Sequence, residues 1–369
     1  MLVDQLEQTR ERTPYPFPEG WYYVASREQI AKSKLLQLTW MGEEIVVWGD
    51  DDGSICVAEA YCPHLGSYLG PDAGGRVCDG RLVCPFHGFE FGTSGQCVAT
   101  PNAPPPRRAT LRVFETQEIA GMVFAWWGID GRKPQWDLPW DPEDVVDLCK
   151  LQMLTMRFRG HPQETTENSV DMGHLSYVHG YRDTYQVGSV LLEQHELRSQ
   201  FHFRRAIKLA GVTALTVDFM AHVLVSGLGY SRVDFFENEI GLEGRLHVMA
   251  TPVDGDVIDF TIACQFSEQR VPNRRFVGMG FLPRRVRAAL FSKFSVWLQR
   301  HDVMQDVTIW SRKRYQRRPR LCRSDGEIMP YRAYCAQFYP EAADDSRYPN
   351  GRSVETVDHE GDVVRSLRV

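Results

Sequence analysis

The stretch from Glu167 to Gly180 reads ENSVDMGHLSYVHG and combines side chains that can hold a transition metal. It carries two imidazoles, His174 and His179, and the carboxylate of Asp171 stands three residues before the first of them. Two histidines and one carboxylate form the ligand set of a mononuclear non-haem iron that leaves positions open for O₂. Histidines beside an acid are also common as structural groups, so the meaning of this stretch depends on the rest of the chain.

Two glycine-rich loops upstream carry a second ligand pattern. The first reads CPHLGSYLGPDAGG from Cys62, and the second reads CPFHGFEF from Cys84. Each loop offers one thiol and one imidazole, because His64 follows Cys62 by two residues and His87 follows Cys84 by three. A [2Fe–2S] cluster with cysteines on one iron and histidines on the other needs this set, so the loops resemble a Rieske centre. A zinc site accepts the same ligands, but zinc modules favour paired cysteines over mixed pairs.

The loops also resemble one type of Rieske centre more than another. High-potential respiratory Rieske proteins have an additional disulfide between the loops, and the corresponding positions here are Ser67 and Phe86. By this resemblance the centre is of the lower-potential kind found in oxygenases and ferredoxins.

Length and composition indicate a globular enzyme of two domains. The chain has 369 residues, 43% of them hydrophobic, and a formal net charge of -6, which argues against a nucleic-acid partner. The longest apolar runs, such as Met122 to Ile129, fall short of the ~20 residues that a membrane helix needs. The N-terminus lacks the apolar segment of a signal peptide. We therefore expect a cytoplasmic protein without a membrane partner, whose nine cysteines are thiols or metal ligands rather than disulfides.

Strand and helix patterns place the motifs in an α+β protein. Short apolar or alternating runs separated by turns predict a small all-β domain that holds both loops, and longer alternating runs predict a large β region after it. A helical pattern follows from about Arg284 to Tyr315, and we expect a buried face on it that contains Leu290, Phe294, Trp297 and Leu298. The predicted division is an extension over 1–20, a Rieske [2Fe–2S] domain over 21–130, a linker over 131–147, a catalytic domain over 148–340 and a polar tail over 341–369.

The two histidines of the first stretch cannot share a metal on a regular α-helix. Five residues advance ~500°, so His174 and His179 would point about 140° apart. We therefore expect a π-type irregularity or a helix that ends near Val178, with Gly180 in the left-handed conformation. Asp171 shares a helix face with His174, but a ligating histidine usually donates its other ring N–H to a carboxylate or carbonyl. That role suits Asp171 better than the role of ligand.

The third ligand of such an iron must come from another part of the chain. The sequence RHDVMQDVTIW in the predicted long helix supplies Asp302 and Asp306, which lie four residues apart on one helix face. Spacing alone does not choose between them.

The motifs together resemble the terminal oxygenase component of Rieske non-haem iron oxygenases. The resemblance rests on CPHLG, CPFHG, ENSVDMGHLSYVHG and QDVTIW, and it extends from about Trp21 to Pro340. The nearest group is the single-subunit type that includes 3-ketosteroid 9α-hydroxylase, on the evidence of SDGEIMPYRAYCAQFYP near the C-terminus. The resemblance implies a helix-grip, START-like catalytic domain with a curved antiparallel sheet and a long C-terminal helix.

The resemblance also implies roles for individual residues. It gives the iron ligands as His174, His179 and Asp306, and the cluster ligands as Cys62, His64, Cys84 and His87. Asp171 would bridge His174 to a cluster histidine of a neighbouring subunit, for which His87 is the matching candidate. Asn168 would lie close to the iron.

The implied activity is hydroxylation, a monooxygenation that uses O₂, of a bulky hydrophobic substrate such as a steroid or terpenoid. The chain lacks a dinucleotide fingerprint, so NAD(P)H-derived electrons would come through a separate flavin or ferredoxin-type reductase. Bridging between subunits implies a homotrimer. Two alternatives stay open: a Rieske-type desaturase or demethylase acting on another substrate, and an electron-transfer Rieske protein without chemistry of its own.

Overall fold

The computed structural model describes residues 15–139, 147–209, 212–237, 241–270, 281–323 and 325–339. Most of the predicted extension, residues 140–146 of the predicted linker and the whole predicted tail lie outside the described residues. The domain boundaries drawn from the sequence therefore stay predictions.

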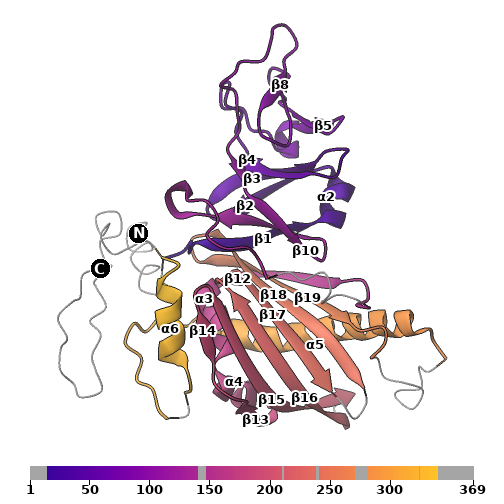
Figure 1. The fold of residues 1–369 in the computed structure, drawn as a ribbon, viewed down its shortest axis with the longest axis vertical. Helices are drawn as coiled ribbons and strands as arrows, with labels where there is room; N and C mark the ends of the chain where they lie inside the picture. Colours follow the sequence, from indigo (N-terminus) through magenta and orange to yellow (C-terminus); the bar gives the residue numbers. More distant parts are fainter. Residues whose placement is uncertain are drawn as a thin grey trace.

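Three small antiparallel sheets build the N-terminal domain (Figure 1). The first has the order β1 (Gly20–Ser26), β11 (Met122–Trp127), β10 (Thr116–Ile119). The second has the order β2 (Leu35–Trp40), β3 (Glu43–Gly49), β4 (Ile55–Glu59), β9 (Val113–Phe114). The third has the order β5 (Arg76–Cys78), β6 (Arg81–Val83), β7 (Glu90–Phe91), β8 (Cys97–Ala99). The helical elements of this domain are α2 (Arg27–Ser33), η1 (Pro71–Ala73) and η2 (Ile129–Gly131).

Strand β3 shows why the sequence of this domain contains continuous apolar runs rather than a regular alternation of apolar and polar residues. Val46 and Trp48 pack in the core beside the cysteine loops, whereas Ile45 and Val47 pack in a second core on the other face of the strand. A strand that is buried on both faces needs apolar residues at successive positions. The first of these cores contains Cys62 and Cys84, so it fixes the loops to the strands of the domain.

An eight-stranded antiparallel sheet forms the centre of the C-terminal domain. Its order is β12 (Gln152–Arg159), β19 (Val257–Phe266), β18 (Leu242–Asp254), β17 (Tyr230–Glu237), β16 (Val212–Ser226), β15 (Glu196–Leu209), β13 (Arg182–Gln186), with β14 (Leu191–Glu193) also paired to β15. The helices among its described residues are α3 (Pro162–Thr166), η4 (Glu167–Ser169), α4 (Met172–Tyr177), α5 (Arg284–Trp310) and α6 (Ile328–Ala336). The α+β prediction of an all-β domain joined to a sheet with a long C-terminal helix is confirmed.

The long helix α5 differs from the sequence prediction in its end. The predicted helix reached Tyr315, but α5 ends at Trp310. The chain leaves the helix and brings the ammonium of Lys313 to the carboxylates of Glu164 at 2.7 Å and Glu167 at 3.2 Å. These partly buried ion pairs hold Lys313, beyond the end of the helix, against the segment that contains Glu164 and Glu167.

The expected buried face of α5 was also wrong in part. Leu290 is 42% exposed and Trp297 is 60% exposed. The positions that are buried against the sheet are mostly small or polar, and they include Ala288 and Ser292. Periodicity identifies an apolar face but does not say what covers it, and here Leu290 and Phe294 border a cavity instead of a closed core.

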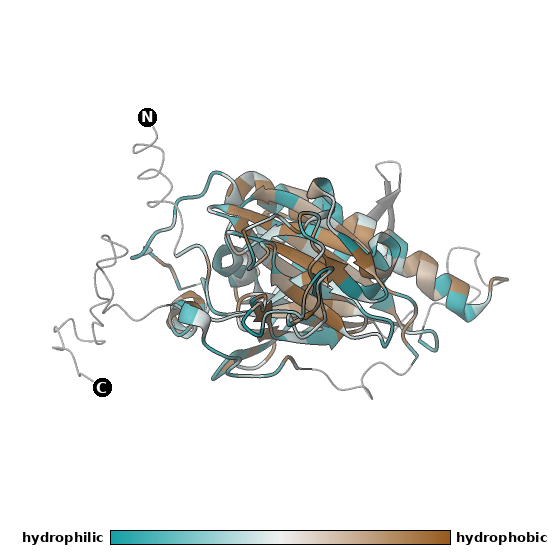
Figure 2. Cartoon of the chain, turned by 90° about the horizontal axis from the view of Figure 1, so that it is seen from above, coloured by the Kyte–Doolittle hydropathy of each residue, from teal (hydrophilic) through white to brown (hydrophobic). Residues whose placement is uncertain are grey.

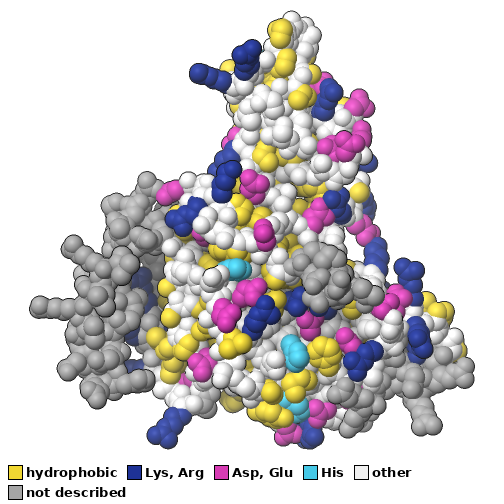
Figure 3. Space-filling view, in the orientation of Figure 1, with side chains coloured by type: hydrophobic (Ala, Val, Ile, Leu, Met, Phe, Trp, Pro, Cys, Tyr) yellow, Lys and Arg dark blue, Asp and Glu magenta, His cyan; other side chains and the backbone are white. Residues whose placement is uncertain are grey.

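The two domains share an aromatic core, and the narrow N-terminal domain stands on the broader C-terminal one (Figure 3). Trp21 and Trp126 of the N-terminal domain pack with Tyr230 and Met249 on the outer face of the large sheet. Brown, hydrophobic strands fill the middle of the molecule when it is seen from above (Figure 2). Of the helices that the structure describes, none has the length and apolar character that would let it span a membrane.

Candidate metal centres and substrate cavity

The stretch from Glu167 to Gly180 folds as a short helix with a sharp exit. Asp171 caps the N-terminus of α4, where its side chain accepts a hydrogen bond from the backbone N–H of His174 at 3.3 Å. The helix ends at Tyr177, and Gly180 has a φ of 67°, in the left-handed region. The prediction that the helix is not regular between His174 and His179 is confirmed, because His179 lies beyond the helix end.

This exit brings His179 to the same place as His174 and Asp306. One ligand atom from each of the three residues lies within 4.8 Å of the others. The Nε2 atom of His179 is 3.4 Å from Oδ2 of Asp306, and the Asn168 side-chain amide donates to the same oxygen at 3.4 Å. Two imidazoles and one carboxylate that converge from two elements fit a mononuclear iron with open positions.

The structure distinguishes between the two aspartates that spacing left open. Asp306 belongs to the convergent group. Asp302, one helical turn earlier, accepts a hydrogen bond from the hydroxyl of Tyr181 at 2.8 Å and pairs with Arg205 at 2.6 Å. Asp302 is therefore engaged in a separate cluster, although it borders the same cavity.

Both histidines use their Nδ1 atoms in contacts with other groups, and His179 directs its Nε2 toward the carboxylate of Asp306. His174 Nδ1 lies 2.5 Å from the backbone carbonyl oxygen of Asp171. His179 Nδ1 lies 2.9 Å from Oε1 of Gln305, a residue 126 positions away in the chain. A histidine ligand is normally oriented by such a contact at its other nitrogen. The sequence carries no spacing signal that identifies Gln305.

Electrostatics at the two histidines differ. Burial lowers the pKa of His174, which favours the neutral imidazole that ligates metals. Burial also acts against the charged form of His179, but hydrogen bonds with Asp306 and Gln305 outweigh it and raise the pKa of that ring. The Asp306 carboxylate thus favours a positive charge beside it. A metal cation bound by His179 and Asp306 would supply such a charge.

The two upstream loops repeat one geometry. The backbone N–H of Gly66 donates to the carbonyl of Cys62 at 2.9 Å, and that of Gly88 donates to the carbonyl of Cys84 at 3.1 Å. Both glycines have a left-handed φ, at 73° and 67°, which side-chain-bearing residues rarely adopt. Each loop therefore presents its cysteine and histidine from an equivalent tight turn.

These turns bring the four predicted cluster ligands together. The imidazole rings of His64 and His87 have centroids 4.8 Å apart, and His64 stacks on Phe89 at 4.4 Å. Both cysteines are buried, and burial together with the neighbouring Cys84 thiol raises the pKa of Cys62 to about 11. Two thiols held side by side in this way suit a shared positive centre. The set fits a [2Fe–2S] cluster with its histidines toward solvent.

The cluster loops and the iron-site residues lie at opposite ends of one chain. The loops belong to the sheet of β5 and β8 at one end of the molecule, whereas α4 and β13 lie at the other (Figure 1). His87 is exposed, and the side chain of Asp171 is 37% exposed. The structure does not bring His87 and Asp171 together within the chain.

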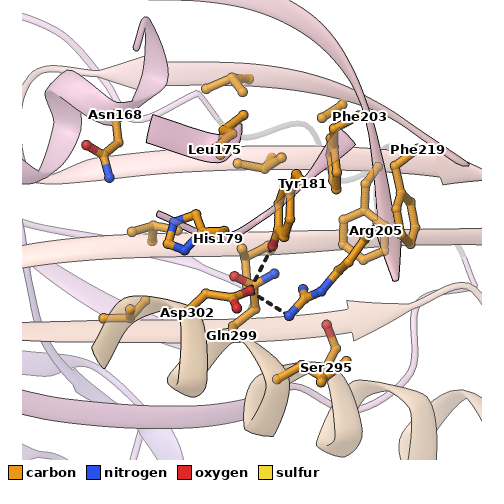
Figure 4. A pocket seen from close by; sticks show the side chains of 18 of the residues that line it. Asn168, Leu175, His179, Tyr181, Phe203, Arg205, Phe219, Ser295, Gln299 and Asp302 are labelled. Atoms are coloured by element: carbon orange, nitrogen blue, oxygen red, sulfur yellow. Dashed lines mark hydrogen bonds and ion pairs between the residues drawn. The ribbon is translucent and has the colours of Figure 1, made fainter. Parts of the chain in front are cut away.

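A cavity of about 840 Å³ lies between the large sheet and α5 (Figure 4). Its wall includes His174, His179 and Asp306. Alternate residues of β16, among them Val217, Phe219 and Val223, point into it because successive side chains of a strand face opposite sides. Its size lies in the range of about 300–1,000 Å³ that small-molecule sites occupy. Most of the lining is aliphatic or aromatic.

Comparison with protein families gives two matches that together span the chain from residue 20 to residue 339. Residues 20–116 match the family described as "Rieske [2Fe-2S] domain". Residues 125–339 match the family described as "3-Ketosteroid 9alpha-hydroxylase C-terminal domain".

Curated relatives and solved structures agree with these matches. Cholesterol 7-desaturase nvd 1 of Ciona intestinalis is 26% identical, over 92% of this chain and 72% of that protein. The oxygenase component of 3-ketosteroid-9-alpha-monooxygenase of Rhodococcus rhodochrous is 26% identical, over 90% of this chain and 86% of that protein.

Dicamba monooxygenase bound to 3,6-dichlorosalicylic acid has the same fold, with a TM-score of 0.64 at 18% identity over 88% of this chain and 98% of that structure. NdmB of Pseudomonas putida CBB5 superposes with a TM-score of 0.62 at 17% identity, over 88% of this chain and 91% of that structure. The chain therefore belongs to the Rieske non-haem iron oxygenases, with a C-terminal domain of the 3-ketosteroid 9alpha-hydroxylase family.

Proposed function

We propose that this chain is a terminal oxygenase that uses O₂, with electrons from a separate reductase, to hydroxylate a bulky hydrophobic, steroid-like substrate. The proposed iron ligands are His174, His179 and Asp306. One observation carries the proposal: these three side chains converge in the wall of a large apolar cavity. A protein that only transferred electrons would have no use for such a cavity.

The bound iron would supply the activation of O₂ against a substrate C–H bond. The chain's own residues prepare the site. Gln305 and the carbonyl of Asp171 contact Nδ1 of His179 and of His174, which leaves the Nε2 atom of each ring available to the iron. Asn168 holds Oδ2 of Asp306 at 3.4 Å. The apolar lining disfavours water beside the substrate, which favours oxidation of the substrate over reduction of O₂ without it.

Two facts support a steroid-like substrate. The cavity takes a large molecule, and its walls are rich in phenylalanine, including Phe203, Phe219 and Phe235. The names of two relatives refer to cholesterol and to a 3-ketosteroid. The same names motivate a second candidate, desaturation, in which two hydrogens leave the substrate and no oxygen enters it. Product analysis distinguishes hydroxylation from desaturation.

The electron route is proposed to run between subunits. Within one chain, the cluster loops and the iron-site residues lie at opposite ends of the molecule, too far apart for a contact. Both His87 and Asp171 are accessible to a neighbouring subunit. A head-to-tail homotrimer in which His87 of one subunit meets Asp171 of the next meets this requirement. The same proposal includes a flavin or ferredoxin-type reductase that delivers NAD(P)H-derived electrons, and a cytoplasmic location.

The experiment that tests the function is turnover of a substrate panel with a reconstituted reductase. Sterols and 3-ketosteroids should be oxidised, and small carboxylated aromatics should not. His174→Ala should keep the Rieske absorption spectrum and lose turnover, whereas the matched control His222→Ala, at an exposed position of β16, should keep both. Turnover of the small aromatics alone would overturn the substrate class. Full turnover by His174→Ala would overturn the site.

A further inference from the structure

Among the described residues, one charged side chain besides the proposed iron ligands and Asp302 lines the apolar cavity. Arg205 of β15 points into it beside Tyr181 and Asp302 (Figure 4). The side chain of Arg205 is 12% exposed. Burial of a guanidinium in an apolar wall is costly unless its charge is paired and its N–H groups find acceptors.

The contacts of Arg205 balance its charge, but they leave some of its N–H groups without an acceptor among the described residues. Nη2 lies 2.6 Å from Oδ2 of Asp302, and the guanidinium carbon lies 5.3 Å from the centroid of the Tyr181 ring. These are its partners among the residues that the structure describes. A guanidinium has more N–H groups than one ion pair uses. Donors that remain unpaired at a cavity wall require an acceptor, and a ligand in the cavity can supply one.

A second polar side chain lies in the same part of the wall. Gln299 precedes Asp302 by three residues on α5, so the two share one face of the helix. Its side chain borders the cavity (Figure 4), and within the described ranges its amide has no hydrogen-bond partner. Gln299 and Arg205 come from the helix and from the sheet, so they flank the cavity from two walls.

We infer that Arg205 and Gln299 form an anchor for one neutral oxygen atom of the substrate, a ketone or a hydroxyl. The inference rests on the proposed function, because it names the polar group that the otherwise apolar substrate must carry. The oxygen accepts a hydrogen bond from the guanidinium, and the Gln299 amide either donates to it or accepts from a hydroxyl.

The charge balance favours a neutral oxygen over a carboxylate. Asp302 already neutralises Arg205. A substrate carboxylate at the anchor would lie close to the Asp302 carboxylate in a medium of low dielectric, where repulsion between like charges is strong. A ketone or hydroxyl adds no charge and still fills the vacant hydrogen bonds.

The test compares matched ligands. A 3-ketosteroid, the corresponding 3-hydroxysteroid, the corresponding steroid hydrocarbon and a steroid carboxylate are titrated into the holoenzyme. Quenching of tryptophan fluorescence reports binding, since Trp310 lines the cavity. Hydrogen bonds to charged groups contribute enough that the ketone and hydroxyl should bind about 10–100-fold more tightly than the hydrocarbon. Equal affinities, or a preference for the carboxylate, would overturn the inference.

Variants separate an anchor from a structural ion pair. Arg205→Met should remove the preference for the oxygenated ligands and leave the affinity of the hydrocarbon unchanged. Gln299→Leu keeps the ion pair and should reduce the preference by about 3–10-fold. The matched control is Arg204→Met, because Arg204 immediately precedes Arg205 on β15 and pairs with Asp218 on the opposite face. If Arg205→Met does not fold, Gln299→Leu decides alone, and an unchanged preference in it contradicts the anchor.

The outcome also distinguishes failure of the anchor from failure of the proposed substrate class. If no steroid binds, the substrate class is wrong, and the anchor is tested with 2-naphthol against naphthalene. A preference for naphthol that Arg205→Met abolishes supports the anchor for another hydrophobic substrate. The same affinity for both compounds overturns it.

Discussion

Asp302 and Asp306 lie one helical turn apart on α5 and face the same cavity, yet they belong to different clusters. The Oδ2 atom of Asp306 lies 3.4 Å from Nε2 of His179, whereas Oδ2 of Asp302 lies 2.6 Å from Nη2 of Arg205. An α-helix advances about 5.4 Å per turn, so this offset separates a metal ligand from an ion-pair partner. The two aspartates are thus a matched pair for assigning the iron ligand.

Asp306→Ala should lose the mononuclear iron and retain the cluster, because the carboxylate that completes the ligand set is removed. Iron content should fall by one atom per chain, with an unchanged Rieske absorption spectrum and loss of substrate turnover. Asp302→Asn should keep its iron, since the Asp302 side chain pairs with Arg205 and Tyr181. Elemental analysis of both purified variants is the measurement. The reverse result, with iron lost only from Asp302→Asn, would contradict the assignment.

Gln305→Leu should weaken iron binding without removing a ligand. Its Oε1 accepts the Nδ1 contact of His179 at 2.9 Å and so fixes the orientation of that ring. Loss of such a supporting contact typically reduces metal affinity by about 10–100-fold. Competition with a chelator measures this affinity. Gln305→Glu keeps an acceptor at the same position and should restore most of it, and equal affinity of Gln305→Leu and the unmodified protein would exclude the orienting role.

Gly180→Ala tests the sharp exit from α4. Gly180 has a φ of 67°, and a Cβ there would meet no heavy atom within 4 Å, so the cost is conformational rather than steric. We expect a loss of about 1 kcal/mol in the free energy of unfolding, together with weaker iron binding because His179 precedes the turn.

Gly188 offers a matched control for this substitution. It has a φ of 70° and equally open surroundings, but it lies between β13 and β14. Gly188→Ala should show a similar loss of stability in thermal denaturation and no change in iron content. If Gly180→Ala and Gly188→Ala change the iron content equally, the left-handed conformation of Gly180 has no special role at the iron site.

Local sequence patterns predicted much of this architecture. Alternation identified the strands of the large sheet, because one face of β16 lines a cavity and the other does not. Cysteine and histidine spacing identified the two loops, whose turns are local and repeat the same backbone contacts. The irregular exit from α4 followed from helix geometry alone, since His174 and His179 would otherwise point apart.

Contacts between distant segments were not accessible from these patterns. Gln305 reaches His179 across 126 residues, and no periodicity connects the two. Arg205 alternates correctly for a strand but reads as a solvent-facing charge until Asp302 is placed beside it. The apolar face of α5 was misread for a related reason, because Leu290 borders a cavity and Trp297 faces outward.

Arg332→Met should lower the free energy of unfolding, because Arg332 is an ion-pair partner of Glu167 at the start of the stretch from Glu167 to Gly180. The Nε atom of Arg332 on α6 lies 2.8 Å from Oε2 of Glu167, and both side chains are buried, at 9% and 11% exposure. Removing one partner of a buried pair leaves an uncompensated charge and costs about 3 kcal/mol or more. Lys313 also contacts Glu167, at 3.2 Å, so part of the charge stays balanced. Thermal denaturation measures the loss, and Arg332→Met combined with Glu167→Gln should recover part of it.

Acid should destabilise the protein through His161, which caps α3 and is fully enclosed. Its Nδ1 accepts the backbone N–H of Gln163 at 3.1 Å, and its Nε2 lies 2.8 Å from the carbonyl of Tyr15, so the ring is held in its neutral form. Burial lowers the pKa of His161 from 6.5 to about 4. The unfolded chain therefore binds more protons between these two values, and stability falls as the pH decreases from 6.5 toward 4.

The size of this effect follows from the shift in pKa of His161. At about 1.4 kcal/mol per pKa unit, roughly 2 kcal/mol of folding free energy is lost between about pH 7 and about pH 5. His161→Asn keeps a side-chain oxygen that can cap α3, but this side chain does not titrate. As the pH falls, the melting temperature of the unmodified protein should therefore decrease more than that of the variant. His222→Asn, at an exposed site, controls for loss of a histidine as such. A constant difference across the pH range would show that His161 does not cause the acid sensitivity.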